Sequence, residues 1–309
     1  MKASSAFSPA AAGKPPHEIE HDTLYGLGAS NKTLAFAGAP VIRTAIIGVS
    51  GRMGRELIRA ASDNPNLSVV AAVASPTSPA IGKDAGELAG IKPIGVRVTN
   101  DLAAGLSQAD VAIDFSDPRV TQSNLTACQL VRKPLLIGTT GFAADLSAAF
   151  EAAAKDIPLL VAPNTSVGVT LLIELVREAA RSLPAQFDIE IVEAHHRMKR
   201  DAPSGTALAL GKAAAEGRSQ PFDKPGSTVR SGGTARQGSE IGFAVVRGGD
   251  IVGEHSVLFA GIGETLTLSH RVTDRAIFAR GALQAAAWLV SQPPGRYFMR
   301  DLVTYKSGS

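Results

Sequence analysis

Residues 193–206 bring together side chains that can move protons and bind anions. They include His195 and His196, two of the six histidines in the chain, and Lys199 with an arginine close by on either side. A histidine titrates near neutral pH, and a lysine can act as an acid or base when burial or cationic neighbours lower its pKa. The same cations would hold a negatively charged ligand. The segment therefore predicts a pocket for a small carboxylated molecule.

The elements on either side of this segment must position it. Residues 187–193 alternate apolar and acidic side chains, which is typical of a half-buried strand, so the histidines should follow at the end of that strand. Ser204 precedes a run of good helix formers over 207–214 and is the natural N-cap. The backbone amides of Gly205 and Thr206 would then face an anion, which the helix dipole also favours.

Composition narrows the classes of protein. The chain has 309 residues, enough for about two domains, with 45% hydrophobic and 19% charged residues, as in a soluble globular protein. A net charge of +3 and 5% aromatics do not indicate a nucleic-acid surface. Cys128 is the only cysteine, so we expect a reducing, cytoplasmic location. No apolar run reaches the roughly 18 residues of a membrane span, so we expect no membrane association. Residues 1–40 lack periodicity and predict a disordered extension.

A glycine-rich turn follows the first apolar strand, expected over 41–47. It reads Gly48-Val49-Ser50-Gly51-Arg52-Met53-Gly54 and leads into a helix expected over 55–61. Strand, glycine turn and helix form the arrangement in which backbone amides approach a pyrophosphate. Ser50 stands where the commoner fingerprint has its second glycine. We interpret the turn as a dinucleotide loop, with a plain structural turn as the alternative.

The second strand, expected over 67–74, ends without the acid that usually holds the ribose 2′-hydroxyl of NAD. The chain reads Val73-Ala74-Ser75-Pro76 there. No carboxylate would repel a 2′-phosphate, and Arg52 lies in the glycine loop. The sequence therefore allows NADPH as well as NADH and leaves the preference open.

Two further turns follow later strands of the α/β pattern. Residues 138–141 follow a strand over 135–137, and residues 162–166 follow a strand over 157–161. The carboxyl ends of parallel strands are where open sheets bind ligands, so both turns are expected to line the cofactor. The alternatives are a polar turn at 138–141 and helix capping by Asn164 or Ser166.

The pattern changes after residue 187. Strands are expected in succession over 188–194, 241–247, 253–260 and 264–271, with one helix inserted, which indicates a second, α+β domain. Residues 220–237 resemble a mobile loop. A last helix over 276–290 is expected to pack back on the first domain. The fold class is thus an α/β Rossmann-type parallel sheet with a second α+β domain.

These motifs together resemble the 4-hydroxy-tetrahydrodipicolinate reductase (dihydrodipicolinate reductase) family of lysine and diaminopimelate synthesis. The resemblance covers about 41–305 and rests on 48–54, 138–141, 162–168, 251–255, 299–302 and, above all, 193–206. It implies hydride transfer from NADPH or NADH to a cyclic imine-like dicarboxylate, with loss of water. It also implies a Rossmann domain (41–166 and 275–309), a mixed-sheet domain for substrate binding and oligomerisation (167–274), and a homotetramer.

The same resemblance implies roles for individual residues. His195 would be the catalytic acid/base and Lys199 the proton donor, while His196, Gly205 and Thr206 would bind substrate. The cofactor would lie along Gly48, Val49, Ser50, Gly51, Arg52, Met53, Ala74, Ser75, Gly138, Thr139, Thr140, Ala162, Pro163, Asn164 and Thr165.

Other functions fit the residues less well. A metal site is not expected, because adjacent histidines on a strand point to opposite faces. A serine hydrolase would need a nucleophile elbow around Ser204, which the sequence lacks. A non-catalytic dinucleotide sensor would not need His195 and Lys199. A related reductase of another small carboxylate remains an alternative, and which proton each of these two residues delivers stays open.

Overall fold

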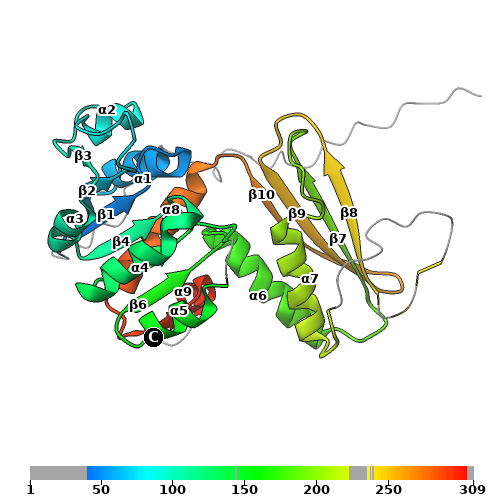
Figure 1. Ribbon diagram of the computed structural model, residues 1–309. Coiled ribbons are helices and arrows are strands. Elements are labelled where there is room, and N and C mark those ends of the chain that lie inside the picture. The colour runs from blue at the N-terminus through cyan, green and yellow to red at the C-terminus, as the bar shows by residue number, and fades with distance from the viewer. Residues whose placement is uncertain (1–39, 143–144, 223–234, 237, 239, 305–309) are drawn as a thin grey trace, which may run out of the picture. The chain divides into compact units, whose positions relative to one another are not determined.

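The computed structural model describes residues 40–142, 145–222, 235–236, 238 and 240–304 (Figure 1). Nearly all of the extension expected over 1–40, and most of the loop expected over 220–237, lie outside these residues. The described part of the chain is organised around two β-sheets. None of its helices is long and apolar enough to cross a membrane.

The first sheet is parallel throughout, with strand order β11-β6-β5-β4-β1-β2-β3. This confirms the expected Rossmann-type sheet. The order reverses between β1 and β4, and a sheet of this kind forms its ligand crevice at such a point, beyond the carboxyl ends of the strands. The strands are β1 (Ile42–Ile47), β2 (Leu67–Val73), β3 (Val98–Thr99), β4 (Val111–Asp114), β5 (Leu135–Ile137), β6 (Pro158–Val161) and β11 (Gly295–Tyr297).

Helices cover both faces of this sheet, which is why its strands are almost continuously apolar. On one face α1 and α8 pack against Ile46 and Ile113, and on the other α3, α4 and α5 pack against Ile47 and Leu135. The helices around this sheet are α1 (Arg52–Ser62), α2 (Ala85–Ala89), α3 (Leu102–Gln108), α4 (Thr121–Leu130), α5 (Ser147–Ala153), α8 (Ala276–Leu289) and α9 (Met299–Thr304), with a 3-10 turn η1 (Pro118–Val120).

The glycine turn packs more tightly than its sequence suggested. Helix α1 begins at Arg52, three residues before the start expected at Arg55, with Gly51 in extended conformation as its N-cap. Gly48 has φ +86°, and a Cβ there would lie 2.6 Å from the carbonyl oxygen of Phe115. A Cβ on Gly54 would lie 2.4 Å from the carbonyl oxygen of Gly48. Glycine at both positions therefore lets the helix start directly above the turn.

The second sheet is mixed, as the resemblance implied, and its strand order is β10-β9-β7-β8. Its one parallel pair among the described strands is β7 with β8, and β9 runs antiparallel to both β7 and β10. Two helices, α6 and α7, pack on one face against Ile189, Ile191 and Phe259 (Figure 1). The elements are α6 (Val167–Ser182), β7 (Asp188–His195), α7 (Gly205–Gly217), β8 (Ile241–Arg247), β9 (Gly253–Ala260) and β10 (Thr265–Val272).

Helix α8 packs back on the first sheet, as predicted, and also holds the connection between β6 and α6. A Cβ on Gly281 would lie 1.9 Å from the carbonyl oxygen of Thr165, so only glycine permits this approach. The hydroxyl of Thr165 donates to the carbonyl oxygen of Phe278 at 2.7 Å. The turn over 162–166 is therefore fixed from below by a helix that comes more than a hundred residues later.

Candidate active site

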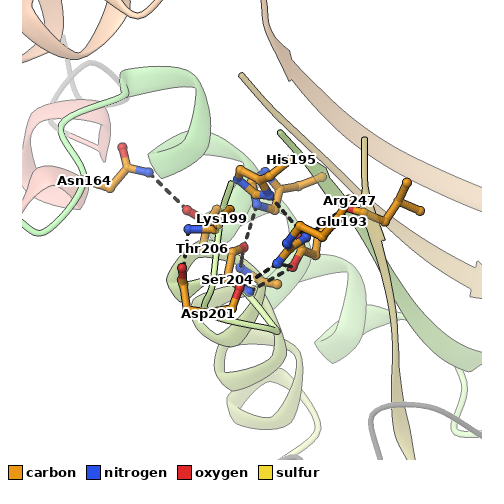
Figure 2. Close-up of polar contacts among 11 residues, drawn as sticks. Asn164, Glu193, His195, Lys199, Asp201, Ser204, Thr206 and Arg247 are labelled. Carbon is orange, nitrogen blue, oxygen red and sulfur yellow. Dashed lines mark hydrogen bonds and ion pairs between the residues drawn. The ribbon is translucent and has the colours of Figure 1, made fainter. Parts of the chain in front are cut away.

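His195 is the last residue of β7 and shares a buried face with Glu193, since residues two apart on a strand point to the same side. The Glu193 side chain has no exposure to water, and its Oε2 accepts a hydrogen bond from Nδ1 of His195 at 2.5 Å (Figure 2). Because Nδ1 is engaged, Nε2 is the ring nitrogen left for a ligand. Burial lowers the pKa of His195 more than its hydrogen bond with Glu193 raises it, so the ring is largely neutral at pH 7.

Arg247 and Ser204 complete the surroundings of the Glu193 carboxylate. Nη1 and Nη2 of Arg247 donate to Oε2 and Oε1, each at 2.8 Å, and the backbone amide of Ser204 donates to Oε1 at 3.0 Å (Figure 2). Burial acts to raise the pKa of Glu193, but the hydrogen bonds from Arg247, His195 and Ser204 outweigh it and lower that pKa. The carboxylate is therefore ionised in the interior.

Lys199 lies on the loop between β7 and α7, and its Nζ is 2.9 Å from Oδ2 of Asp201 (Figure 2). The neighbours of Lys199 that the sequence indicated were the arginines on either side of it. The hydrogen bond from Lys199 lowers the pKa of Asp201. An ionised partner thus stands beside the amine, and the Lys199 side chain is 22% exposed, within reach of a ligand in the cavity.

Ser204 caps α7 as predicted. Its Oγ accepts a hydrogen bond from the amide of Ala207 at 3.2 Å. Thr206 in the same first turn accepts at Oγ1 from Nδ2 of Asn164 at 3.2 Å, which joins α7 to the turn after β6 (Figure 2). A Cβ on Gly205 would meet nothing within 4 Å, so the helix start is open to a ligand. The first turn can therefore bind an anion.

His255 on β9 adds a second buried histidine. Its Nε2 lies 3.0 Å from Oγ of Ser204, and its ring meets that of His195 edge to face, with centroids 5.1 Å apart. Burial lowers the pKa of His255 to about 4, with a further contribution from His195. His255 is therefore a neutral part of the wall behind His195.

Two cavities meet at these residues. One, of about 600 Å³, reaches between α6 and α9 and includes Gly205; the other, of about 610 Å³, reaches the glycine turn and includes His196. The space they share is lined by turns that follow β5 and β6, by the end of β7 with its following loop, and by the start of α7: Thr140, Ala162, Pro163, Asn164, His195, Lys199 and Thr206. The predicted proton-transfer residues therefore face the predicted cofactor turns.

The second cavity fits a dinucleotide. Gly51 is the N-cap of α1 and has no side chain that could accept a hydrogen bond from the helix. The amides of the first helical turn are therefore available for a phosphate. The cavity is also lined by Phe115 and Ser116 after β4, which the sequence did not single out, and by predicted residues: Gly51, Arg52, Met53, Gly138, Thr139, Thr140, Ala162, Pro163, Asn164 and Thr165.

Five predicted cofactor residues line neither cavity. The amides of Gly48 and Val49 both donate to the carbonyl oxygen of Val73, at 2.9 and 3.1 Å, so these two residues shape the turn. Ser50 lies between them and Gly51. Ala74 is buried and Ser75 exposed after β2, with Oγ of Ser75 3.2 Å from Oγ1 of Thr77. Within the described residues no cluster of three or more His, Cys, Asp or Glu could hold a metal.

Sequence reasoning missed the part that Glu193 plays, and it missed Asp201, Arg247 and His255. The spacing of Glu193 and His195 on a strand could have paired them, because positions two apart share a face. Arg247 and His255 could not be found in this way, because they reach the site through pairing of β7 with β8 and β9.

Comparisons with known proteins match both halves of the chain to the same family. Residues 42–165 match the family described as dihydrodipicolinate reductase, N-terminus, and residues 168–303 match its C-terminus. The 4-hydroxy-tetrahydrodipicolinate reductase of Anaeromyxobacter dehalogenans is 47% identical, over 86% of this chain and 99% of that protein. The reductase of Alkalilimnicola ehrlichii is 49% identical, over 84% and 98%. The solved dipicolinate-bound dihydrodipicolinate reductase from Paenisporosarcina sp. TG-14 is 27% identical, with TM-score 0.67 over 84% of this chain and 97% of that chain.

Replacing His255 with glutamine is expected to weaken the dependence of stability on pH. The imidazole of His255 takes up a proton near pH 6.5 in the unfolded chain and only near pH 4 in the folded chain. Its contribution to the free energy of unfolding is therefore complete above pH 6.5 and is lost as pH falls toward 4. Between about pH 7.5 and pH 5, the free energy of unfolding measured with urea should fall by about 2 kcal/mol more in the wild type than in His255→Gln. Parallel losses in the two proteins would contradict this.

Proposed function

The chain belongs to the 4-hydroxy-tetrahydrodipicolinate reductase family. On that premise we propose that His195 and Lys199 transfer the protons of the reaction, and that other residues of the two cavities bind substrate and cofactor. The chain is an NAD(P)H-dependent oxidoreductase that reduces 4-hydroxy-tetrahydrodipicolinate to tetrahydrodipicolinate with loss of water, a step of diaminopimelate and lysine synthesis. The observation that carries the proposal is the convergence of His195, Lys199 and Thr206 with the cofactor turns on one space.

The two proton-transfer residues suit the demands of hydride addition. When bound, the dinucleotide supplies a hydride from its nicotinamide ring. The substrate then carries negative charge that a proton must neutralise, and the donor must stand in the same space. His195 offers Nε2 as an acid/base, and Lys199 offers an ammonium group as proton donor. Both line both cavities, so each faces substrate and cofactor together.

We assign substrate binding to His196, Gly205 and Thr206. The Paenisporosarcina reductase was solved with dipicolinate, a dicarboxylate, and a dicarboxylate suits this site. One carboxylate would accept hydrogen bonds from the amides at the start of α7, and the nearby cations would balance the charge. The hydrogen bond from Asn164 to Thr206 sets this helix start against the turn that lines the cofactor cavity.

The cofactor is NADH or NADPH. We propose that it lies along the residues predicted from the sequence, with the amides of Arg52 and Met53 nearest the pyrophosphate, and the ribose near Ala74 and Ser75. No acid stands at the end of β2, and Arg52 is exposed in the first turn of α1. We therefore expect NADPH to be used at least as well as NADH.

We further propose that residues 41–166 and 275–309 bind the dinucleotide, and that residues 167–274 bind substrate and form a homotetramer in the cytoplasm. Helices α6 and α7 cover one face of the second sheet, and exposed apolar side chains occur on or beside its strands, at Val246, Ile262 and Leu266. Sedimentation velocity should give four times the 31.9 kDa of one chain. A monomeric mass would refute the tetramer.

The activity itself can be tested directly. The purified chain should oxidise NADPH and NADH, followed by nicotinamide absorbance, when synthase-generated 4-hydroxy-tetrahydrodipicolinate is supplied. We expect the rate with NADPH to equal or exceed the rate with NADH. If neither cofactor is oxidised, the proposed function is wrong.

Replacing Lys199 with alanine should lower turnover by about 100-fold or more, because a positioned proton donor contributes about 10²–10⁴ in rate. Affinity for NADPH, measured by fluorescence titration, should stay within about twofold, since Lys199 acts on the substrate. Lys212→Ala, an exposed lysine on α7, is the matched control and should keep full activity. Loss of NADPH binding in Lys199→Ala would mean that its role is misassigned.

A further inference from the structure

We propose that Glu193, held by Arg247, is a positioning residue that keeps the neutral ring of His195 protonated on Nδ1 and leaves Nε2 free toward the cavity. The inference rests on the acid/base role of His195 in the proposed function and extends it to residues with no assigned part in the reaction. Neither side chain needs to touch the substrate for this role.

The donors around Glu193 determine the tautomer. Its carboxylate is fully buried and receives hydrogen bonds from two guanidinium nitrogens, one backbone amide and Nδ1 of His195. An ionised carboxylate has no proton to give, so Nδ1 must be the donor in its own contact. A neutral imidazole carries one N–H, and Nε2 is therefore left as an acceptor that can take or pass a proton.

Arg247 determines the charge of the pair. An isolated buried carboxylate would draw a proton onto the imidazole beside it, because the imidazolium would balance its charge. The bidentate guanidinium already supplies that balance. The other charged or titratable groups that face His195 are Lys199 on the following loop and His255 on β9. His195 can therefore remain neutral and cycle its proton during turnover.

The ring of His195 is also confined in space. A Cβ on Gly253 of β9 would lie 3.1 Å from Nε2 and 3.4 Å from Cδ2, and the His255 ring meets it edge to face. Arg247 in addition donates to the carbonyl oxygen of Asp201 at 2.6 Å. Asp201 holds the amine of Lys199, so Arg247 links both proposed proton-transfer side chains to one buried carboxylate.

Glu193→Gln tests the role of the carboxylate. Glutamine has one acceptor oxygen and would turn its NH₂ group toward either His195 or the Arg247–Ser204 donors, so the Nδ1–H tautomer loses its support. We expect kcat to fall about 100-fold or more, with KM for substrate and NADPH within about threefold. The matched control is Glu190→Gln, on the opposite face of the same strand and paired with Arg236, which should keep kcat within about twofold. An unchanged kcat in Glu193→Gln would overturn the proposal.

The tautomer can be measured independently of activity. Long-range ¹H–¹⁵N correlation spectra of the wild-type protein at neutral pH should show His195 protonated at Nδ1, with its signals assigned by their loss in His195→Gln. The Glu193→Gln spectrum should move toward the Nε2–H form. A wild-type ring protonated at Nε2 would refute the proposal even if Glu193→Gln fails to fold. Absence of reductase activity in the wild type would refute the proposed function instead, because the spectrum does not depend on turnover.

Discussion

The Glu193 carboxylate is a negative charge without access to water, and the site depends on how that charge is satisfied. A buried ion is tolerated only when its surroundings supply both an opposite charge and hydrogen bonds. Here β8 supplies Arg247, the loop before α7 supplies the amide of Ser204, and β7 supplies His195. Three segments are thus placed by one group. Removing Arg247 would leave the buried carboxylate of Glu193 uncompensated, and an uncompensated buried charge typically costs about 3–5 kcal/mol.

The two sheets meet the demands of the reaction in different ways. The first sheet contributes backbone groups, namely its glycine turns and the open amides at a helix start. Gly48 and Gly54 supply no side chain and so leave room for that helix start. The second sheet provides side chains whose charges and protons are set by their neighbours. The hydrogen bond from Asn164 to Thr206 is a direct link between the two. The proposed cofactor turns and the proposed substrate site are therefore joined by a hydrogen bond between two side chains.

Much of this could be predicted because the signals are local. The strand before His195, the cap at Ser204 and the alternation of strands and helices each depend on a few adjacent residues. Strands β3 and β11 were not predicted, because Val98–Thr99 and Gly295–Tyr297 form no apolar run, whereas the equally short β5 was predicted from three consecutive apolar residues. Arg247 and His255 were missed for another reason. Each contacts a partner more than fifty residues away, in a register set by strand pairing that no local pattern encodes.

Helix α8 and strand β11 give the first sheet a dependence on the order of synthesis. The helix fills one face of a sheet begun at residue 42, and β11 adds to the edge of β6, yet both come from the last part of the chain. During translation the early strands emerge long before these partners, so the apolar face that α8 covers stays uncovered until α8 has been made. The turn at Thr165 likewise lacks its support until Gly281 and Phe278 have been made. The nascent chain therefore completes its first sheet only after the whole second sheet has been synthesised.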